Sequence, residues 1–177
     1  MTIKDITYGG LSITLMAICS WISIPFAVPF TMQTFAIFFI CFLFGAKRGS
    51  IYVFCYILCG LLGMPVFSGF QGGVHVIFGL TGGYIVGFLL SALLLWATQK
   101  IWSPCKKIVL LLALIGLVIC YGFGTAWFLI ISQQQGSILT IGSVLMTCVV
   151  PFILPDCIKI FLAYRLAGRL RFYISAL

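Results

Sequence analysis

The stretch PFILPDCIKIFLAYRLAGRLRF (151–172) combines a long apolar run with one acid, a lysine three residues further on and three arginines near its end. An apolar run of this length suits a membrane-spanning helix, which needs about 20 residues. Two prolines interrupt its start, and a proline inside a helix removes a backbone donor. We therefore predict a spanning helix over residues 155–173, with Pro155 and Asp156 in its first turn, preceded by a short helix (138–150) near the outer surface.

The composition extends this interpretation to the whole chain of 177 residues. Hydrophobic residues make up 63% and charged residues only 7%, whereas soluble domains carry about 25% charged residues. Such a chain cannot cover its surface in water, so we predict a single integral membrane domain over residues 1–177, with the lipid bilayer as its solvent. The net charge of +8 then concerns membrane topology, and we expect no nucleic-acid partner.

Proline, glycine and charged residues separate the apolar runs from one another. We therefore predict an all-α membrane protein with six transmembrane helices. A glycine-rich outer loop (63–83) joins the third span to the fourth, and the short outer-face helix precedes the last span. The first run lacks a small-x-small cleavage site, which favours a span over a signal peptide. The predicted spans lie near residues 7–24, 32–44, 50–62, 82–98, 108–131 and 155–173.

The basic residues predict the orientation of these spans. Nine of the ten lysines and arginines lie before the first span, after the second, after the fourth or at the end of the sixth. The other three connections (25–33, 63–81 and 132–154) contain none. Basic residues concentrate on the cytoplasmic side of a membrane. We therefore predict a multi-pass protein of the cytoplasmic (inner) cell membrane with both termini in the cytoplasm.

The one basic residue outside this pattern is Lys159, which follows Asp156 by one helical turn. Residues three apart share a helix face, so the two side chains can meet. One interpretation is an internal ion pair that locks helices together. The other is a polar site for a ligand with an anionic end and a hydrogen-bonding end. We favour the ligand site, because an ionisable group within a spanning helix usually faces a cavity or a partner.

Other chemistry finds little support in the sequence. The chain has one histidine, two acidic residues, no CxxC pair and no phosphate-binding GxxxxGK[ST] motif. We therefore expect no enzyme activity, no catalytic residue, no metal site and no cofactor. The eight cysteines are interpreted as apolar packing residues, although the sequence leaves a disulfide open. Helix packing explains the row Gly79, Gly83 and Gly87 at least as well as ligand binding does.

A family resemblance appears in four blocks that occur in order along nearly the whole chain: WISIPFAVPFTMQTFAI (21–37), LCGLLGMPVFSGFQGG (58–73), GLTGGYIVGF (79–88) and PFILPDCIKIFLAYRLAG (151–168). Together they resemble the BioY family, the biotin-binding S components of energy-coupling-factor (ECF) transporters. The resemblance implies a six-helix membrane protein that captures biotin from outside the cell. It also implies partners, namely a transmembrane coupling protein and two ATPase subunits that hydrolyse ATP.

The resemblance also implies substrate-binding residues. The family's Asp and Lys near the start of the last helix correspond to Asp156 and Lys159, which are expected to contact the two polar ends of biotin. The polar residue of the glycine-rich loop corresponds to Gln71, and the ring-packing aromatic corresponds to Tyr84.

The sequence departs from the family pattern in three places. It has GLTGG (79–83) where the family usually has GPTGG, and Pro155 where the family usually has glycine. The small-residue row that docks the coupling protein on helix one is broken here, since the nearest row consists of Ser12, Met16 and Ser20. This break leaves open whether the protein works with ECF partners or acts alone.

Two alternatives to biotin binding remain open. One is an S component for another vitamin, although a thiamine site would not need the positive charge of Lys159. The other is a structural membrane protein, without a transport role, that is stabilised by an Asp–Lys pair. Ligand binding by the purified protein separates these alternatives from biotin binding.

Overall fold

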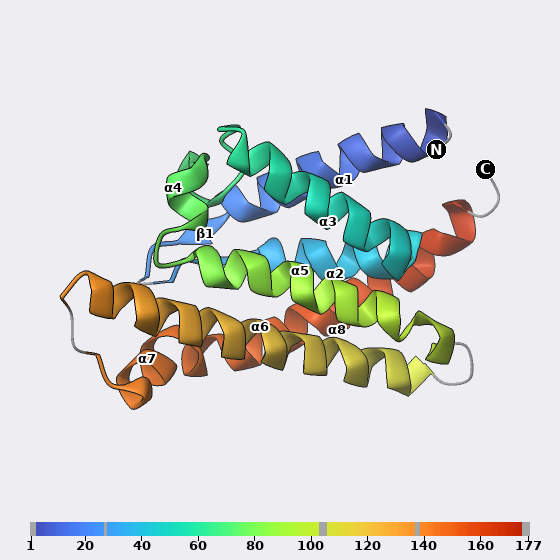
Figure 1. Ribbon diagram of the computed structural model, residues 1–177. Coiled ribbons are helices and arrows are strands. Elements are labelled where there is room, and N and C mark those ends of the chain that lie inside the picture. The colour runs from blue at the N-terminus through green and yellow to red at the C-terminus, as the bar shows by residue number, and fades with distance from the viewer. Residues whose placement is uncertain (1–2, 27, 103–105, 137–138, 175–177) are drawn as a thin grey trace.

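The computed structural model describes residues 3–26, 28–102, 106–136 and 139–174, and Figure 1 shows the chain. Six long helices form the body of the protein: α1 (Ile3–Trp21), α2 (Gln33–Phe44), α3 (Ala46–Leu61), α5 (Gly82–Ala97), α6 (Lys106–Gln134) and α8 (Val150–Ile174). Short elements connect them: the hairpin of β1 (Ser23–Ile24) and β2 (Phe30–Thr31), the 3-10 turns η1 (Ser68–Phe70) and η2 (Gln99–Ile101), and the helices α4 (Val74–Ile77) and α7 (Ile141–Cys148).

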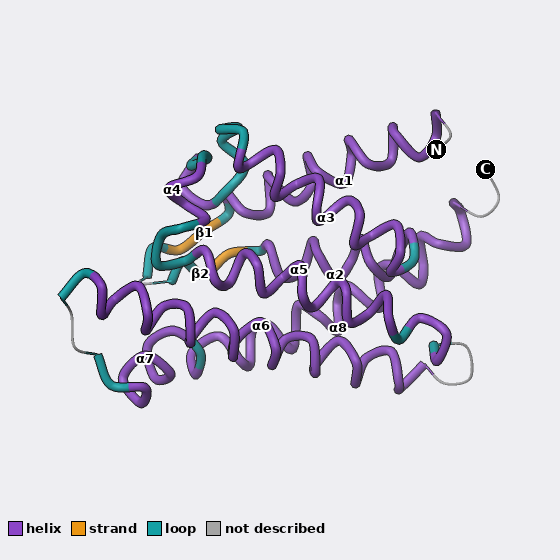
Figure 2. The backbone as a smooth tube through the Cα atoms, viewed as in Figure 1, coloured by secondary structure: helices purple, strands orange, loops and turns teal. Residues whose placement is uncertain are grey.

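The long helices run along the length of one bundle (Figure 1). The segments that connect them differ between its two ends. Both described chain ends lie at one end, together with the turn between α2 and α3 and the connection from α5 to α6. The β hairpin, α4 and α7 lie at the opposite end, which we call the hairpin end (Figure 2). The basic connections predicted to share one side of the membrane therefore lie at one end of the bundle.

Helix α2 is the centre of the packing. Ten of its twelve residues are buried, and it packs against α8, α3 and α1. Its sequence QTFAIFFICFLF is apolar on every side, as expected of a helix surrounded by other helices. The chain then reverses at Gly45, whose φ of 85° is favourable for glycine and costly for other residues.

By length and hydropathy alone, fewer of the described helices qualify as membrane crossings than the six spans predicted from the sequence. Among the described helices, Lys107–Gln134 is long and apolar enough to cross a bilayer unaided. The bent pair Ile141–Cys148 and Val150–Arg171 passes the same test together, while α2 and α5 are apolar but shorter. Each predicted span overlaps one long helix, so six crossings stay a prediction that is consistent with this fold.

The proline-rich region differs from the prediction. Helix α7 ends at Cys148, the chain bends by 41° and α8 begins at Val150, five residues before the predicted start of the last span. Pro151 lies in the first turn of α8, where its missing N–H would have no helical partner. Pro155 lies inside the helix, where it removes one hydrogen bond without ending the helix. Asp156 therefore lies beyond the first turn of α8, and the predicted placement of Asp156 in the first turn is wrong.

The glycine row is explained by helix packing at two of its three positions. A β-carbon on Gly83 would collide with Trp127 of α6, and one on Gly87 would lie 2.9 Å from the Cys120 backbone. These two glycines therefore allow α5 and α6 to approach closely. Gly79 precedes α5 and lies instead against the backbone of α4.

Candidate ligand-binding cavity

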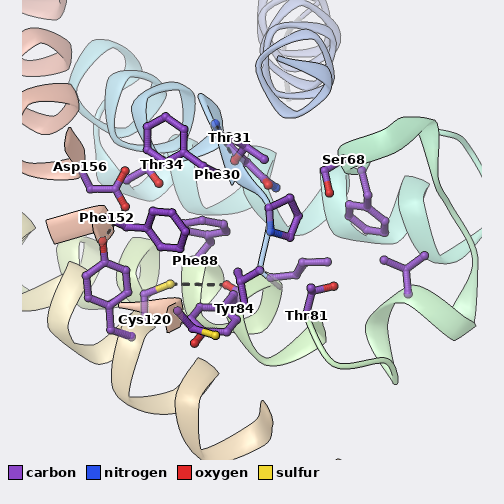
Figure 3. Close-up of a pocket in the computed structure, with 18 residues that line it drawn as sticks. Phe30, Thr31, Thr34, Ser68, Thr81, Tyr84, Phe88, Cys120, Phe152 and Asp156 are labelled. Atoms are coloured by element: carbon purple, nitrogen blue, oxygen red, sulfur yellow. Dashed lines mark hydrogen bonds between the residues drawn. The ribbon is translucent and has the colours of Figure 1, made fainter. Parts of the chain in front are cut away.

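A cavity of about 60 Å3 lies at the hairpin end of the bundle. Its walls come from the helices α2, α4, α5, α6, α7 and α8, the strand β2 and the loop that contains η1. Figure 3 shows that Asp156, Tyr84 and Cys120 border the same space although they lie on three different helices. Most of the lining is apolar, with a few polar groups, as is typical of sites for small organic molecules.

Asp156 and Lys159 form an ion pair, which is one of the two interpretations that their spacing in the sequence left open. The lysine Nζ lies 2.8 Å from Asp156 Oδ1, and each residue is only 5% exposed. Nζ also donates a hydrogen bond of 2.7 Å to the Thr31 carbonyl and lies 3.6 Å from the centre of the Phe30 ring. Asp156 lines the cavity, whereas Lys159 lies behind it. The pair thus ties α8 to the β hairpin as well as supplying a carboxylate to the cavity.

Tyr121 of α6 completes this network, and sequence reasoning missed it. Its hydroxyl donates a hydrogen bond of 2.6 Å to Asp156 Oδ2. The signal available was a tyrosine in the middle of an apolar run (108–131) that otherwise has few polar groups. With Lys159 on Oδ1 and Tyr121 on Oδ2, the carboxylate is fixed in orientation. Each carboxylate oxygen can accept a further hydrogen bond, so Asp156 retains acceptor capacity toward the cavity.

Tyr84 also lines the cavity, as expected for a residue that packs against a ligand ring. Its ring lies so close to Gly124 that a β-carbon there would collide with it. Its hydroxyl is 3.4 Å from Thr125 Oγ1, a long contact. The ring is therefore held from behind by α6.

Two further polar side chains of the cavity were not singled out from the sequence. Gln33 and Thr34 open α2, and both are buried and line the cavity. The Gln33 amide nitrogen donates to the Tyr56 hydroxyl at 3.0 Å. Among the described residues, no hydrogen-bond partner is found for the Gln33 amide oxygen or the Thr34 hydroxyl. These groups are available to a ligand.

Gln71 lies outside the cavity, with an exposed side chain. Its connection to the cavity runs through the backbone, because its carbonyl accepts a hydrogen bond of 2.9 Å from the N–H of Phe67, which lines the wall. The intervening turn contains Phe70 at a φ of 57°, an uncommon value for a bulky residue. Of the four predicted residues, Asp156 and Tyr84 therefore line the cavity, Lys159 contacts it only through Asp156, and Gln71 lies outside.

The row of residues on helix one that was compared with the family's docking row for the coupling protein does not lie on the surface of the bundle. Ser12, Met16 and Ser20 are 2%, 0% and 0% exposed, so this face of α1 points into the bundle. The Ser20 hydroxyl donates to the Val66 carbonyl and helps to anchor the glycine-rich loop. This row therefore cannot contact another protein in the assembled bundle.

No three His, Cys, Asp or Glu side chains among the described residues lie close enough to hold a metal ion. The seven described cysteines are free thiols, and Cys105 lies outside the described residues. A carboxylate held by a lysine and a tyrosine inside an apolar cavity is suited to accepting N–H groups of a ligand.

Comparisons with known proteins agree with this picture. The BioY family profile matches residues 1–176. The biotin transporter BioY of Thermotoga maritima is 34% identical over 174 residues, covering 95% of this chain and 96% of that protein. A probable biotin transporter BioY of Pyrococcus horikoshii is 31% identical and covers 97% and 98%.

A solved structure shares the fold along almost the whole chain. It is a crystal structure of the S-component for biotin from an ECF-type ABC transporter, with a TM-score of 0.83 and 28% sequence identity. The match covers 97% of this chain and 94% of that one. The all-α fold is therefore that of an ECF S component, and the chain belongs to the BioY family.

Proposed function

We propose that the protein captures biotin for uptake across the cytoplasmic membrane, as the S component of an ECF-type transporter. The observation that carries this proposal is the Asp156 carboxylate, held by Tyr121 and Lys159 at the wall of an apolar cavity. Biotin has a neutral ureido ring with two N–H donors, and an ionised carboxylate accepts such donors. The names of the relatives support biotin over another vitamin.

The polar groups divide into ligand contacts and supports. Asp156 accepts ureido N–H groups, and Gln33 and Thr34 offer neutral polar groups nearby. Tyr84 packs against the ring system. Lys159 holds the carboxylate in place, because its ammonium is already engaged by Asp156 and the Thr31 carbonyl.

The sequence-based expectation that Lys159 contacts one polar end of biotin, its carboxylate, requires the ammonium to become accessible to the ligand, because Lys159 is buried and does not line the cavity. Biotin methyl ester distinguishes the two roles. If Lys159 binds the biotin carboxylate, the ester binds wild type about tenfold or more weakly than biotin, since a charge-assisted contact is lost. If Lys159 supports Asp156, the ester and biotin bind with similar affinity.

Binding requires the cavity to widen. Its volume of about 60 Å3 lies well below the ~300–1,000 Å3 of small-molecule sites. Two of the lining segments lie outside the α-helices: the hairpin with Phe30 and Thr31, and the segment of Phe67 and Ser68 at the start of η1. We propose that these segments separate to admit biotin, and that movement of the second brings Gln71 to the ligand.

Titration of the detergent-purified protein with biotin by calorimetry tests the proposal. Biotin is expected to bind with a 1:1 ratio, and thiamine and riboflavin at the same concentrations are expected to give no heat of binding. Binding of thiamine or riboflavin instead would support an S component for another vitamin. Absence of binding by all three would favour a structural role for the Asp–Lys pair.

The proposed orientation places six spans in the membrane, with both termini in the cytoplasm. Support comes from the basic connections, which lie at the same end of the bundle as both described chain ends. Gln134→Cys and Lys107→Cys place exposed thiols at opposite ends of α6. A membrane-impermeant maleimide added to intact cells is expected to label the first variant only. Labelling of the second variant only would reverse the orientation.

The proposed partners are a transmembrane coupling protein and two ATPase subunits, since this chain has no phosphate-binding loop. The exposed side of α1 carries Gly10 and Thr14, and a β-carbon on Gly10 would meet nothing. Small residues four apart allow a neighbouring membrane helix to approach closely. Gly10→Leu is expected to abolish co-purification with the coupling protein while leaving biotin binding intact. Unchanged co-purification would indicate another docking face or a protein that acts alone.

A further inference from the structure

A second cavity is lined by Phe42, Trp102, Val109 and residues 164–171 of α8. The elements that supply this lining meet at the end of the bundle opposite the hairpin end (Figure 1). The cavity is bordered by α8, α6, the end of α2 and the residue after η2. Its volume of about 500 Å3 lies within the ~300–1,000 Å3 of small-molecule sites. The two cavities share no lining residue, so the function proposed for the first does not account for the second.

Three arginines border this second cavity: Arg165, Arg169 and Arg171. The first two are four residues apart and therefore share a face of α8. A guanidinium group is always charged and offers a planar fork of donors that fits the oxygens of a phosphate or carboxylate. The cavity is thus strongly cationic on one side.

The chain cannot neutralise these arginines with its own acidic side chains. It contains two such residues, and both are paired elsewhere. Asp5 lies 3.2 Å from Arg48, and Asp156 lies 2.8 Å from Lys159 at the hairpin end. In the described chain, the positive charge around the second cavity therefore has no internal carboxylate partner.

The other side of the second cavity is aromatic and apolar. Phe42, Trp102 and Tyr164 line it, with the Phe42 ring 6.3 Å from that of Trp102 and 5.6 Å from that of Tyr164. The Trp102 indole N–H is buried and makes no hydrogen bond within the described part of the chain. A ligand that fits both sides must combine anionic oxygens with apolar groups.

The helix around the arginines has the pattern of a membrane boundary. Leu162, Leu166 and Leu170 are 51%, 43% and 37% exposed and alternate with the arginines along α8. Exposed leucines suit acyl chains, while arginine side chains extend toward headgroups. We infer that the second cavity binds the phosphate-bearing headgroup of an anionic phospholipid, with its first acyl carbons against the aromatic side.

A lipid fits these features better than the other anions do. A free phosphate ion would meet the arginines but leave the aromatic side without a partner. An acidic peptide would likewise supply charge without an acyl chain. The phosphate chemistry is common to the lipid and the free ion, so the experiment must separate those two sources.

Lipid binding to the full chain in neutral detergent micelles can be followed by native mass spectrometry. Wild type is expected to bind dioleoyl phosphatidylglycerol about tenfold or more tightly than dioleoyl phosphatidylcholine. Arg165→Gln with Arg169→Gln is expected to reduce this preference to about twofold or less. The matched control is Lys47→Gln with Lys100→Gln, which removes the same charge from exposed residues at the same end, outside the cavity. The control is expected to keep the wild-type preference.

A third variant separates the cavity from the surface. A β-carbon on Gly168 would meet nothing within 4 Å, so Gly168→Leu fills space in the cavity while keeping every charge. It is expected to lose the preference for phosphatidylglycerol. An undiminished preference in Gly168→Leu, or an equal loss in the arginine and lysine pairs, would show that general surface charge attracts the lipid and would overturn the inference.

Two competition arms test the source of the phosphate. Inorganic phosphate at millimolar concentration is expected to leave bound phosphatidylglycerol in place, because it cannot replace the acyl contacts. Complete displacement would assign the cavity to a free phosphate ion. Displacement by an oligoglutamate peptide at equal concentration would assign it to an acidic protein partner. Either of these results overturns the lipid assignment.

Discussion

The two halves of α8 carry the same kind of charge in opposite settings. Lys159 is buried and held by Asp156, the Thr31 carbonyl and the Phe30 ring. Arg165 and Arg169, less than three turns further on, are exposed and border an open cavity. A charge removed from water requires a partner fixed in place, whereas a charge at a membrane boundary can remain solvated. The same helix thus presents a paired site at one end and an unpaired cationic site at the other.

The first test of this contrast is to break the buried pair, where the largest effect is expected. Lys159→Met leaves Asp156 buried without its cation, and such a change costs about 3–5 kcal/mol of stability. Asp156→Leu with Lys159→Met removes both charges and is expected to recover most of that loss. Unfolding in a graded detergent series measures these differences.

The matched control for this test is Arg169→Gln on the same helix, which is expected to change stability by about 0.5 kcal/mol or less because the side chain is exposed. Equal losses in Lys159→Met and Arg169→Gln would remove the distinction between the two halves. The double variant is also expected to lose biotin binding, because it lacks the carboxylate.

A second test concerns the ligand end of the pair. Asp156→Asn keeps the shape of the side chain but replaces an acceptor oxygen by a donor amide. We expect biotin affinity to fall roughly tenfold to a hundredfold, equivalent to about 1.5–3 kcal/mol for a hydrogen bond to a charged group. Calorimetry with biotin and with a valerate-tailed analogue that lacks the ureido ring completes a cycle of two proteins and two ligands. Additive losses would mean that Asp156 supports Lys159 without contacting the ureido group.

Tyr121→Phe is expected to have a smaller effect, because the tyrosine acts through Asp156. The variant loses the 2.6 Å hydrogen bond to Asp156 Oδ2 while keeping the aromatic ring. Biotin affinity should fall about threefold to tenfold, as for one hydrogen bond of ~1 kcal/mol. Tyr84→Phe is the matched control, since its hydroxyl makes only a 3.4 Å contact. An equal loss in both variants would indicate a general effect of removing hydroxyl groups.

The sequence predicts the contact between Asp156 and Lys159 better than it predicts the surroundings of that pair. The ion pair follows from two charges three residues apart in an apolar run, because helix geometry alone places them together. Tyr121 joins the pair only when α6 packs beside α8, which a single sequence does not reveal. The predicted start of α8 is wrong because the sequence analysis treats both Pro151 and Pro155 as breaks in the helix. In the structure, α8 begins just before Pro151 and continues through Pro155.

The predicted role of Gln71 depends on a movement, which makes it the most sensitive test of how the hairpin end receives its ligand. In this structure the side chain is exposed and outside the cavity, although its carbonyl is bonded to Phe67 in the wall. If loop movement brings Gln71 to biotin, Gln71→Ala removes one neutral hydrogen bond worth about 0.5–1.5 kcal/mol and weakens binding roughly twofold to tenfold. The loss should appear as faster dissociation of biotin, because a contact made after entry stabilises the bound state. The control is His75→Ala, which changes an exposed residue of the neighbouring helix α4 outside the cavity and is expected to leave dissociation unchanged. Unchanged dissociation in Gln71→Ala as well would mean that the site is complete without this side chain. Asp156, held by Lys159 and Tyr121, would then recognise biotin from the helices alone.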